Sequence, residues 1–286
     1  MNFNLYKQAQ DYEAIAKPFL IENEDVYSLF YGILQGIKAG RYDNPVMAAI
    51  EDDDRVVALF QMTPPHPMNI IIIDETKTDV ILTFAAKEFL QRDIQIPSAV
   101  GLKPVIFAFA ENWKELTQCE TKLLMDQGLY RLDKVADSLD MSPGTWRFAR
   151  KDEATLIEDW YVAFNQDVGL APSSRESIRE KVAQFLDDQE VFFWELDGKV
   201  VSMMKKARPS EHGVTVSFVF TPKEERQKGY ARTMVAAGSE ELLKTYDFCV
   251  LYTDMMNPTS NKIYQEIGYR KIADSVHLEF VSKEDE

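Results

Sequence analysis

A charged loop between an apolar stretch and a helix-like stretch carries the clearest chemical signal in this sequence. Residues 219–231 read VFTPKEERQKGYA. Backbone N–H groups at such a helix start, helped by the positive end of the helix dipole, bind phosphate groups. Gly229 can take a positive φ or let the backbone approach a ligand, and the small Ala231 lets the helix start pack closely. We therefore predict an anion site here, although the loop alone also fits a solvated turn.

A second informative segment follows at 251–269, LYTDMMNPTSNKIYQEIGY. Together the two segments resemble the two core motifs of the GNAT superfamily of N-acetyltransferases. On the pyrophosphate motif, Q/R-x-x-G-x-G/A, this chain places Arg226, Gly229 and Ala231. On the second motif, N-x-x-(S/A)-x-x-x-Y-x-x-x-G-(F/Y), it places Asn257, Ser260, Tyr264, Gly268 and Tyr269.

The resemblance implies an α/β fold with a mixed central sheet flanked by helices, and it implies acetyl-CoA as the cofactor, with CoA as the product. Pantetheine would lie against the backbone of 219–221, and the amides of 227–232 would hold the pyrophosphate. Arg226, Lys228 and Arg232 would add positive charge. The cofactor-binding residues implied in this way are Val219, Phe220, Thr221, Arg226, Gln227, Lys228, Gly229, Tyr230, Ala231, Arg232, Asn257 and Asn261.

Acetyl transfer to an amine needs a neutral nucleophile, stabilisation of an oxyanion and a proton for the departing thiolate. Tyr264 is the best candidate for the acid, because its phenol holds a proton at neutral pH. It also has a purely structural reading, as an aromatic ring packed in a core. For the base, Asp254 is a candidate that also suits a turn or helix cap, and Glu195 is one that also suits a solvated strand position.

The composition limits the partners and the compartment. A net charge of -15, from 47 Asp and Glu against 32 Lys and Arg, repels phosphate backbones, so we expect no nucleic acid partner. Cys119 and Cys249 form no metal-binding spacing, and we expect no metal. The start of the chain lacks a signal-peptide pattern and no apolar run could span a bilayer, which indicates a cytoplasmic protein without a membrane partner.

Hydrophobic periodicity and turn residues predict the elements that would position this site. In the first half we expect helices at 25–39 and 79–91, a hairpin of 46–50 and 56–62, a buried strand at 68–73, a helix from 105–116 and a strand at 128–135. In the second half we expect a strand at 145–149, helices at 152–164 and 175–186, and a hairpin of 190–196 and 199–205 around Asp197-Gly198. Strands at 214–220, 249–253 and 276–281 and helices at 231–246 and 259–267 complete the chain.

The turn Ser142-Pro143-Gly144 separates two predicted domains. Residues 144–286 would form the catalytic acetyltransferase domain. Residues 1–143 would form a second α/β lobe that resembles a degenerate acetyltransferase domain or serves the substrate or an interaction. No R-x-x-G-x-G/A loop precedes Gly144, so we expect this first lobe not to bind CoA.

The function predicted in this way is acetyl-CoA-dependent N-acetyl transfer, by direct transfer to a primary amine of a small molecule or peptide. The alternative is a catalytically weak CoA-binding regulatory module, since no base is evident. A nucleotide-binding protein is a third reading, but neither GxxxxGK(S/T) nor GxGxxG occurs in the chain. The sequence leaves room for a homodimer.

Overall fold

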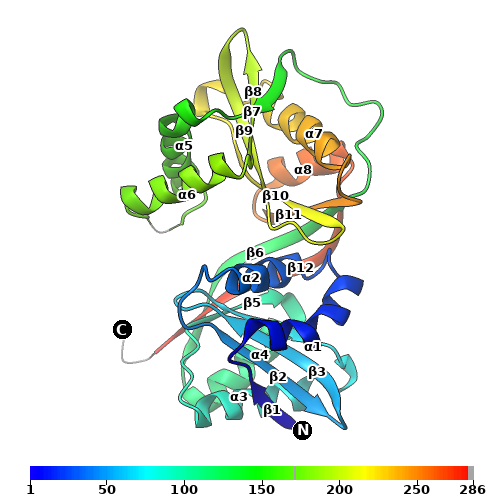
Figure 1. Cartoon of the computed structure of the whole chain (residues 1–286), viewed down its shortest axis with the longest axis vertical. Helices are drawn as coiled ribbons and strands as arrows, with labels where there is room; N and C mark the ends of the chain where they lie inside the picture. The colour runs from blue at the N-terminus through cyan, green and yellow to red at the C-terminus, as the bar shows by residue number, and fades with distance from the viewer. Residues whose placement is uncertain (171, 283–286) are drawn as a thin grey trace. The chain divides into compact units, whose positions relative to one another are not determined.

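The computed structural model describes residues 1–170 and 172–282, and Figure 1 shows its helices and strands. The chain divides into two compact units. Unit 1 comprises 1–129, 252–258 and 271–286, and unit 2 comprises 130–251 and 259–270. The predicted second domain extends to residue 286, so its last four residues lie outside the described part of the chain.

The element order repeats once along the chain, as strand, two helices, three strands, helix, strand, helix, strand. The first copy consists of β1 (Asn2–Leu5), α1 (Ala9–Glu22), α2 (Ser28–Lys38), β2 (Val46–Asp52), β3 (Arg55–Met62), β4 (Met68–Ile72), α3 (Thr78–Gln91), β5 (Ser98–Leu102), α4 (Lys103–Thr117) and β6 (Glu120–Leu132). The second consists of β7 (Thr145–Phe148), α5 (Ala154–Asp167), α6 (Arg175–Asp187), β8 (Val191–Leu196), β9 (Lys199–Ala207), β10 (Gly213–Phe220), α7 (Tyr230–Leu242), β11 (Phe248–Asp254), α8 (Pro258–Ile267) and β12 (Arg270–Val281). This repetition agrees with two related α/β lobes.

Unit 1 is a sheet with helices on both faces. Its strands run in the order β1-β2-β3-β4-β5-β12-β6, with β4 parallel to β5 and β12 antiparallel to β5. One face of β2 and β3, with Ile50 and Phe60, packs against α3 and α4, and the other, with Ala49 and Leu59, packs against α1 and α2. The alternation of residues between two apolar layers is the pattern of a sheet buried on both sides.

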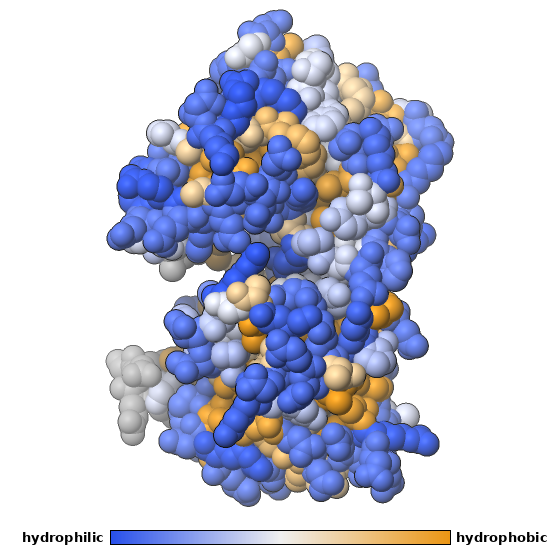
Figure 2. Space-filling model, in the orientation of Figure 1, coloured by the Kyte–Doolittle hydropathy of each residue, from blue (hydrophilic) through white to orange (hydrophobic). Residues whose placement is uncertain are grey.

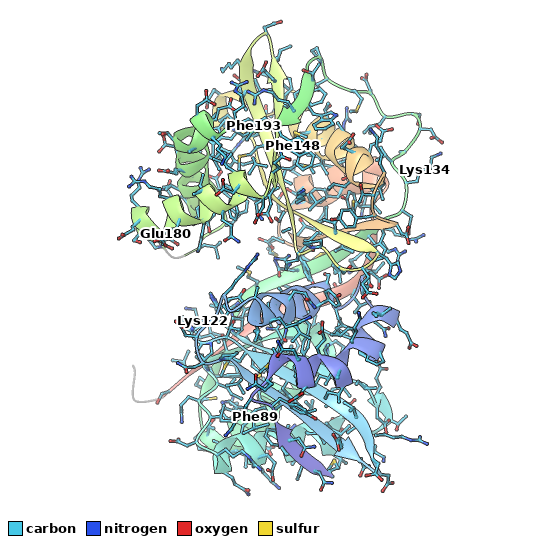
Figure 3. All side chains as sticks on the ribbon, viewed as in Figure 1. Phe89, Lys122, Lys134, Phe148, Glu180 and Phe193 are labelled. Carbon is cyan, nitrogen blue, oxygen red and sulfur yellow. The ribbon has the colours of Figure 1, made fainter. Side chains whose placement is uncertain are left out.

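Unit 2 repeats this layering around β7, β8, β9, β10 and β11. The hairpin of β8 and β9 turns at Asp197 and Gly198, as predicted, and β9 pairs antiparallel with β10. Figure 3 labels Phe193, which packs with α5 and α6, and Phe148, which packs against the α7 and α8 core. The site region of β10 is therefore held between two hydrophobic layers.

The sequence predicts most of these elements correctly, but it misses β1, α1 and β5. Helix α1 buries a narrow stripe, Tyr12, Ala16 and Leu20, on a segment that contains Pro18, so its periodicity is weak. Strand β6 begins at Glu120, eight residues before the predicted start, because its first five residues are all exposed and show no alternation. Helix α7 ends at Leu242, earlier than the predicted 246.

The predicted boundary at 143/144 and the two compact units divide the chain differently. The reason is β12: it follows α8 in the second copy of the repeat, but it pairs with β5 of the first copy and lies in unit 1. A single boundary in the sequence cannot separate the two units, because a strand of the second copy lies in the first unit. The functional division at 143/144 stays a prediction.

The surface is ordinary for a folded acidic protein. In Figure 2 hydrophilic residues cover most of the visible face, and hydrophobic residues appear in small separate patches. Among the described residues no helix has the length and apolarity needed to cross a membrane.

Candidate functional site

Within the described residues, strand β10 leaves part of its edge without a partner strand. It pairs there in parallel with β11 from Gly213 opposite Phe248 to Thr215 opposite Val250. On its other side it pairs with β9, and the register shifts between Ser217 and Phe220. Phe218 lies within this bulge at φ 49°. A bulge bends a strand and redirects its polar groups, so the backbone after Thr215 is open on the β11 side.

The loop after β10 ends in the helix start that the sequence predicts. A short 3₁₀ turn, Lys223–Glu225, leads to Gly229, which is the N-cap of α7 at φ 80°. Gln227 also has a positive φ of 63°. Glycine is the residue that takes this left-handed conformation without a side-chain penalty, so the predicted positive φ at Gly229 is confirmed.

The backbone N–H groups of this loop are available to an anion. Within 1–170 and 172–282, no protein acceptor is recorded for the N–H groups of Gln227, Lys228 and Gly229, and the helical bonding of α7 starts with Thr233 N–H donating to Gly229 O at 3.0 Å. The first N–H groups of a helix have no partner within it. Successive free N–H groups with the helix dipole behind them form an anion site.

The cations of the loop are paired with carboxylates, which the sequence did not predict. Arg226 contacts Asp167 at 2.5 Å, and Arg232 contacts Glu266 at 3.0 Å. Lys228 contacts Glu225 at 2.8 Å. The expected positive charge is thus largely balanced in place, and the backbone N–H groups remain as the principal anion donors.

Glu225 holds the loop in place through two ion pairs. It is buried, with 6% of its surface exposed, and it accepts from Lys199 at 2.5 Å as well as from Lys228. The hydrogen bond from Lys199, followed by that from Lys228, lowers the pKa of Glu225. A carboxylate held ionised between two ammonium groups ties the loop to the start of β9.

Two of the three residues expected to contact pantetheine have carbonyl oxygens that already accept hydrogen bonds. Ser202 donates to Phe220 O at 3.2 Å, and Arg226 Nε donates to Thr221 O at 2.9 Å. No such side-chain bond to Val219 O is recorded among the described residues. Val219 is therefore the best placed of the three to pair with a ligand amide.

Tyr264 and Asn261 lie on the buried face of α8, one turn apart. Tyr264 is buried in the core of unit 2, with its ring centroid 6.0 Å from that of Tyr269 in an edge-on contact. Burial raises the pKa of Tyr264 to about 12. The phenol is therefore protonated at neutral pH, as a proton donor must be, and it also makes the packing contact of the structural reading.

Asp254 and Asn257 belong to unit 1, whereas the loop 221–232, Asn261 and Tyr264 belong to unit 2. Asp254 is exposed, and its Oδ1 accepts from the N–H of Met256 at 2.8 Å. The N–H of Asn257 donates to Asp254 O at 3.0 Å. These contacts are those of a turn-forming aspartate, which was the alternative to a catalytic base at this position.

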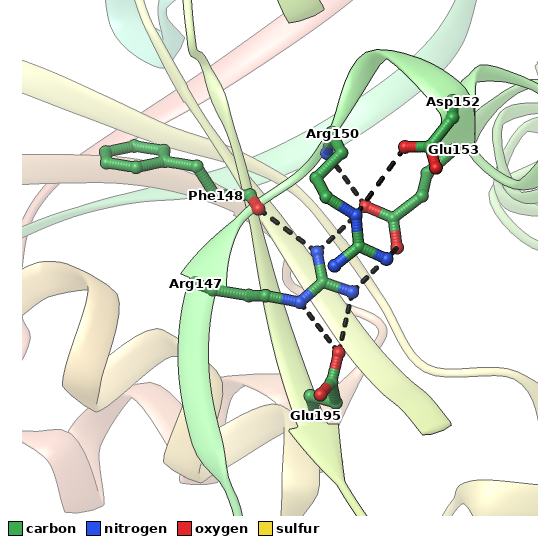
Figure 4. Close-up of polar contacts among 6 residues, drawn as sticks. All are labelled: Arg147, Phe148, Arg150, Asp152, Glu153 and Glu195. Atoms are coloured by element: carbon green, nitrogen blue, oxygen red, sulfur yellow. Dashed lines mark hydrogen bonds and ion pairs between the residues drawn. The ribbon is translucent and has the colours of Figure 1, made fainter. Parts of the chain in front are cut away.

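Glu195, the other candidate base, lies in an ion-pair network drawn in Figure 4. Arg147 on β7 donates through Nε to Glu195 at 2.7 Å and through its terminal nitrogens to Glu153 at 2.8 and 2.6 Å. Arg150 adds a contact with Glu153 at 3.0 Å. The network joins β7, β8 and the start of α5, so Glu195 has a structural role here.

The corresponding loop of the first copy differs in chemistry. Between β4 and α3, Asp74 accepts from the N–H and the hydroxyl of Thr76, at 3.2 and 2.5 Å. Lys77 in the same loop contacts Asp52 at 2.7 Å. Asp74 therefore caps the short 3₁₀ turn Glu75–Lys77, and α3 begins after Lys77, where the second copy has Gly229 before α7. That the first lobe does not bind CoA stays a prediction.

The sequence analysis missed the residues that support the loop from a distance. Ser142 contacts Lys228 and Thr233, and Asp167 contacts Arg226. Ser142 was read only as part of a boundary turn, and Asp167, which the structure places at the end of α5, was not singled out. No motif marks either one. Among the described residues no group of His, Cys, Asp and Glu is arranged to hold a metal ion.

Comparison with known proteins bears on the fold and on one segment. Residues 197–278 match the family described as FR47-like protein. A GNAT-family acetyltransferase from Colwellia psychrerythraea is similar in structure, with 12% identity, a TM-score of 0.63 and coverage of 98% of this chain and 100% of that one. A GCN5-related N-acetyltransferase from Sphaerobacter thermophilus has 14% identity, a TM-score of 0.64 and coverage of 97% and 95%.

A tandem GNAT protein from the clavulanic acid biosynthesis pathway is also similar, with 10% identity, a TM-score of 0.58 and coverage of 98% of both chains. No curated protein matched the chain in sequence. At these identities the likeness concerns the fold, and the predicted mixed α/β class with two related lobes is confirmed.

Proposed function

From the premise that this chain has the two-lobed fold of GNAT-superfamily acetyltransferases, as its sequence motifs indicated, we propose that it transfers an acetyl group from acetyl-CoA to a primary amine. The acceptor is an amine on a small molecule or peptide. The cofactor lies along β10, with its pyrophosphate at the start of α7. The enzyme class is an N-acetyltransferase.

One observation carries this proposal: an open strand edge leads directly to an anion site. In the part of the chain that the structure describes, the backbone of β10 after Thr215 has no partner strand on the β11 side. The N–H groups of Gln227, Lys228 and Gly229 follow a few residues later with no recorded protein acceptor in the described chain. A ligand with amide groups at one end and a diphosphate at the other suits both parts, and CoA has this composition.

The transfer itself is a direct displacement. The neutral amine attacks the thioester carbonyl, a C–N bond forms, and the C–S bond breaks to release the CoA thiolate. The amine loses a proton and the thiolate gains one, so the step balances as amide plus CoA thiol. A backbone N–H near Val219 would stabilise the oxyanion, and Tyr264 would donate to the thiolate sulfur.

A water molecule is the simplest base for this reaction. Asp254 accepts a turn hydrogen bond and Glu195 accepts from Arg147, so both carboxylates have structural roles, and the role of Asp254 as a base stays a prediction. An amine that reaches the site in its neutral form needs only a water molecule to carry its proton away. We expect the rate to rise with pH as the free acceptor amine loses its proton.

The two buried, unpaired cysteines of the described chain, Cys119 and Cys249, support a reducing compartment, and we place the protein in the cytoplasm. Its acidic balance of charge favours cationic acceptors. We propose no nucleic acid or membrane partner. A measurement of the oligomeric state would test for a homodimer.

Steady-state release of thiol from acetyl-CoA, measured with a panel of primary amines, tests the proposal. Turnover with at least one amine, and none without an amine, is the expected result. Tight CoA binding with no turnover on any amine would instead favour the catalytically weak regulatory module. Absence of CoA binding would contradict both functions.

A further inference from the structure

Residues 133–144, here called the strap, join β6 to β7 and are held by hydrogen bonds to other segments of unit 2. In Figure 1 the strap passes beside α7 and α8, and Figure 3 labels Lys134 near its start. The N–H of Ala136 donates to Ile267 O at 2.9 Å, and Arg232 donates to Asp140 O at 2.8 Å. Trp194 donates to Pro143 O at 3.0 Å. The strap is therefore a fixed part of the wall around the start of α7.

Ser142 attaches the strap to the anion loop itself. Its N–H donates to Thr233 Oγ1 at 2.8 Å, and its hydroxyl donates to Lys228 O at 3.0 Å. A Cβ atom added at Gly229 would lie 2.7 Å from Ser142 Oγ. Glycine at position 229 thus provides both the positive φ and the space for this serine.

The hydrogen bond to Lys228 O also fixes the direction of the neighbouring Gly229 N–H group. The C=O of Lys228 and the N–H of Gly229 belong to one planar trans peptide and point in opposite directions. When the carbonyl is held by Ser142, the N–H of Gly229 points away from the strap. This N–H has no recorded protein acceptor in the described chain. Without the serine, the freedom of Gly229 would let this peptide plane rotate.

We propose that Ser142 is a positioning residue for acyl-CoA, which holds the Gly229 N–H in the direction that the cofactor's pyrophosphate requires. This inference rests on the proposed function and goes beyond it. It assigns the segment between the two halves of the chain to the cofactor site. The donated hydrogen bond also polarises the peptide, which strengthens the Gly229 N–H as a donor.

The test compares Ser142→Ala with the parent on two acyl donors, acetyl-CoA and S-acetylpantetheine, which lacks the pyrophosphate. With acetyl-CoA, the KM of Ser142→Ala rises about five- to tenfold, as expected for the loss of one hydrogen bond, while kcat stays within about twofold. With S-acetylpantetheine, both constants stay at the parent values. Ser142→Thr, which keeps the hydroxyl, restores the KM for acetyl-CoA.

Ser138→Ala is the matched control, because Ser138 is an exposed serine on the same strap. It leaves both donors unaffected. An equal rise in KM for the two donors would overturn the inference, since a general loosening of the site does not depend on the pyrophosphate. Calorimetric titration of the parent with CoA comes first. If the parent does not bind CoA, both the proposed function and this inference are wrong. If the parent binds CoA and Ser142→Ala binds it with the same affinity, only the inference is wrong.

Discussion

Replacement of Tyr264 by phenylalanine separates its two roles. The change keeps the buried ring and its edge-on contact with Tyr269, and it removes only the hydroxyl group. If the ring serves packing alone, the rate of acetyl transfer stays the same. If the hydroxyl assists the departing thiolate, kcat falls while the affinity for CoA is retained.

The size of the fall follows from the raised pKa. Burial raises the pKa of Tyr264 to about 12, whereas a thiol such as that of CoA ionises near about 8.5, so full proton transfer to the thiolate is uphill by about 5 kcal/mol. A hydrogen bond to the forming thiolate has no such cost and contributes about 1.5–3 kcal/mol. The expected loss in kcat is therefore about 10- to 150-fold.

The assay is thiol release at saturating acetyl-CoA and amine, with the CoA dissociation constant measured in parallel. The pH profile adds a second check: because the folded pKa is raised, the donating phenol persists as the pH increases to about 12, and Tyr264 should cause no alkaline fall below that point. A Tyr264→Phe enzyme with kcat within about threefold of the parent would refute the donor role, since the departing thiolate would then need no hydrogen bond from the phenol.

Three further predictions concern two ion pairs and a buried thiol of unit 2. Asp167→Asn frees Arg226 from its ion pair, so CoA should bind about two- to fivefold more tightly in low salt. The gain in affinity should be smaller in high salt, which screens the charge of Arg226. Weaker binding of CoA in titration calorimetry would contradict this prediction. Arg147→Ala leaves Glu153 and Glu195 without their main cation, so the free energy of unfolding should fall by about 2–3 kcal/mol in thermal or denaturant unfolding. Replacement of the exposed Arg150 by alanine is the control and should change the free energy of unfolding little. Burial, the largest single effect, acts to raise the pKa of Glu153, but the hydrogen bonds from Arg147 and from the Arg150 N–H, with the charges of both arginines, together outweigh it and the net pKa is lowered. This stability is therefore present above the ordinary value of 4.5 and is lost as the pH falls through the folded value, and Arg147→Ala should weaken that acid dependence. Burial raises the pKa of Cys249 to about 12, so this thiol should react with iodoacetamide at pH 8 only after unfolding, which mass spectrometry can follow.

The sequence predicted the anion loop because its signals are local. A strand, a glycine at the helix start and a small residue after it lie within a dozen positions, and together with the segment 251–269 they match the two GNAT motifs, whereas the loop alone also fits a solvated turn. The repeated order of elements was not visible in the hydrophobic patterns, because β1, α1 and β5 of the first copy were not predicted. Helix α1 was missed because its buried stripe is too narrow to stand out from its polar residues.

The support of the loop could not be predicted, because its partners are distant in the chain. Asp167 lies 59 residues from Arg226, and Ser142 lies 86 residues from Lys228. Nothing in the local sequence distinguishes a paired arginine from a free one, so the cations were expected to attract the cofactor directly. Likewise, the exchange of β12 into unit 1 depends on strand pairing that no single segment reveals.

The most direct test of the central claim follows the backbone amides of the loop during titration with CoA. In ¹H–¹⁵N correlation spectra of the ¹⁵N-labelled chain, we predict that the largest shifts occur at Lys228, Gly229 and Tyr230, with smaller ones at Val219. Amides of the acidic loop at Asp74 and Thr76 should stay unchanged. Saturable binding of CoA that leaves Gly229 and Tyr230 unshifted, or that shifts Asp74 and Thr76 instead, would contradict a pyrophosphate site at the start of α7.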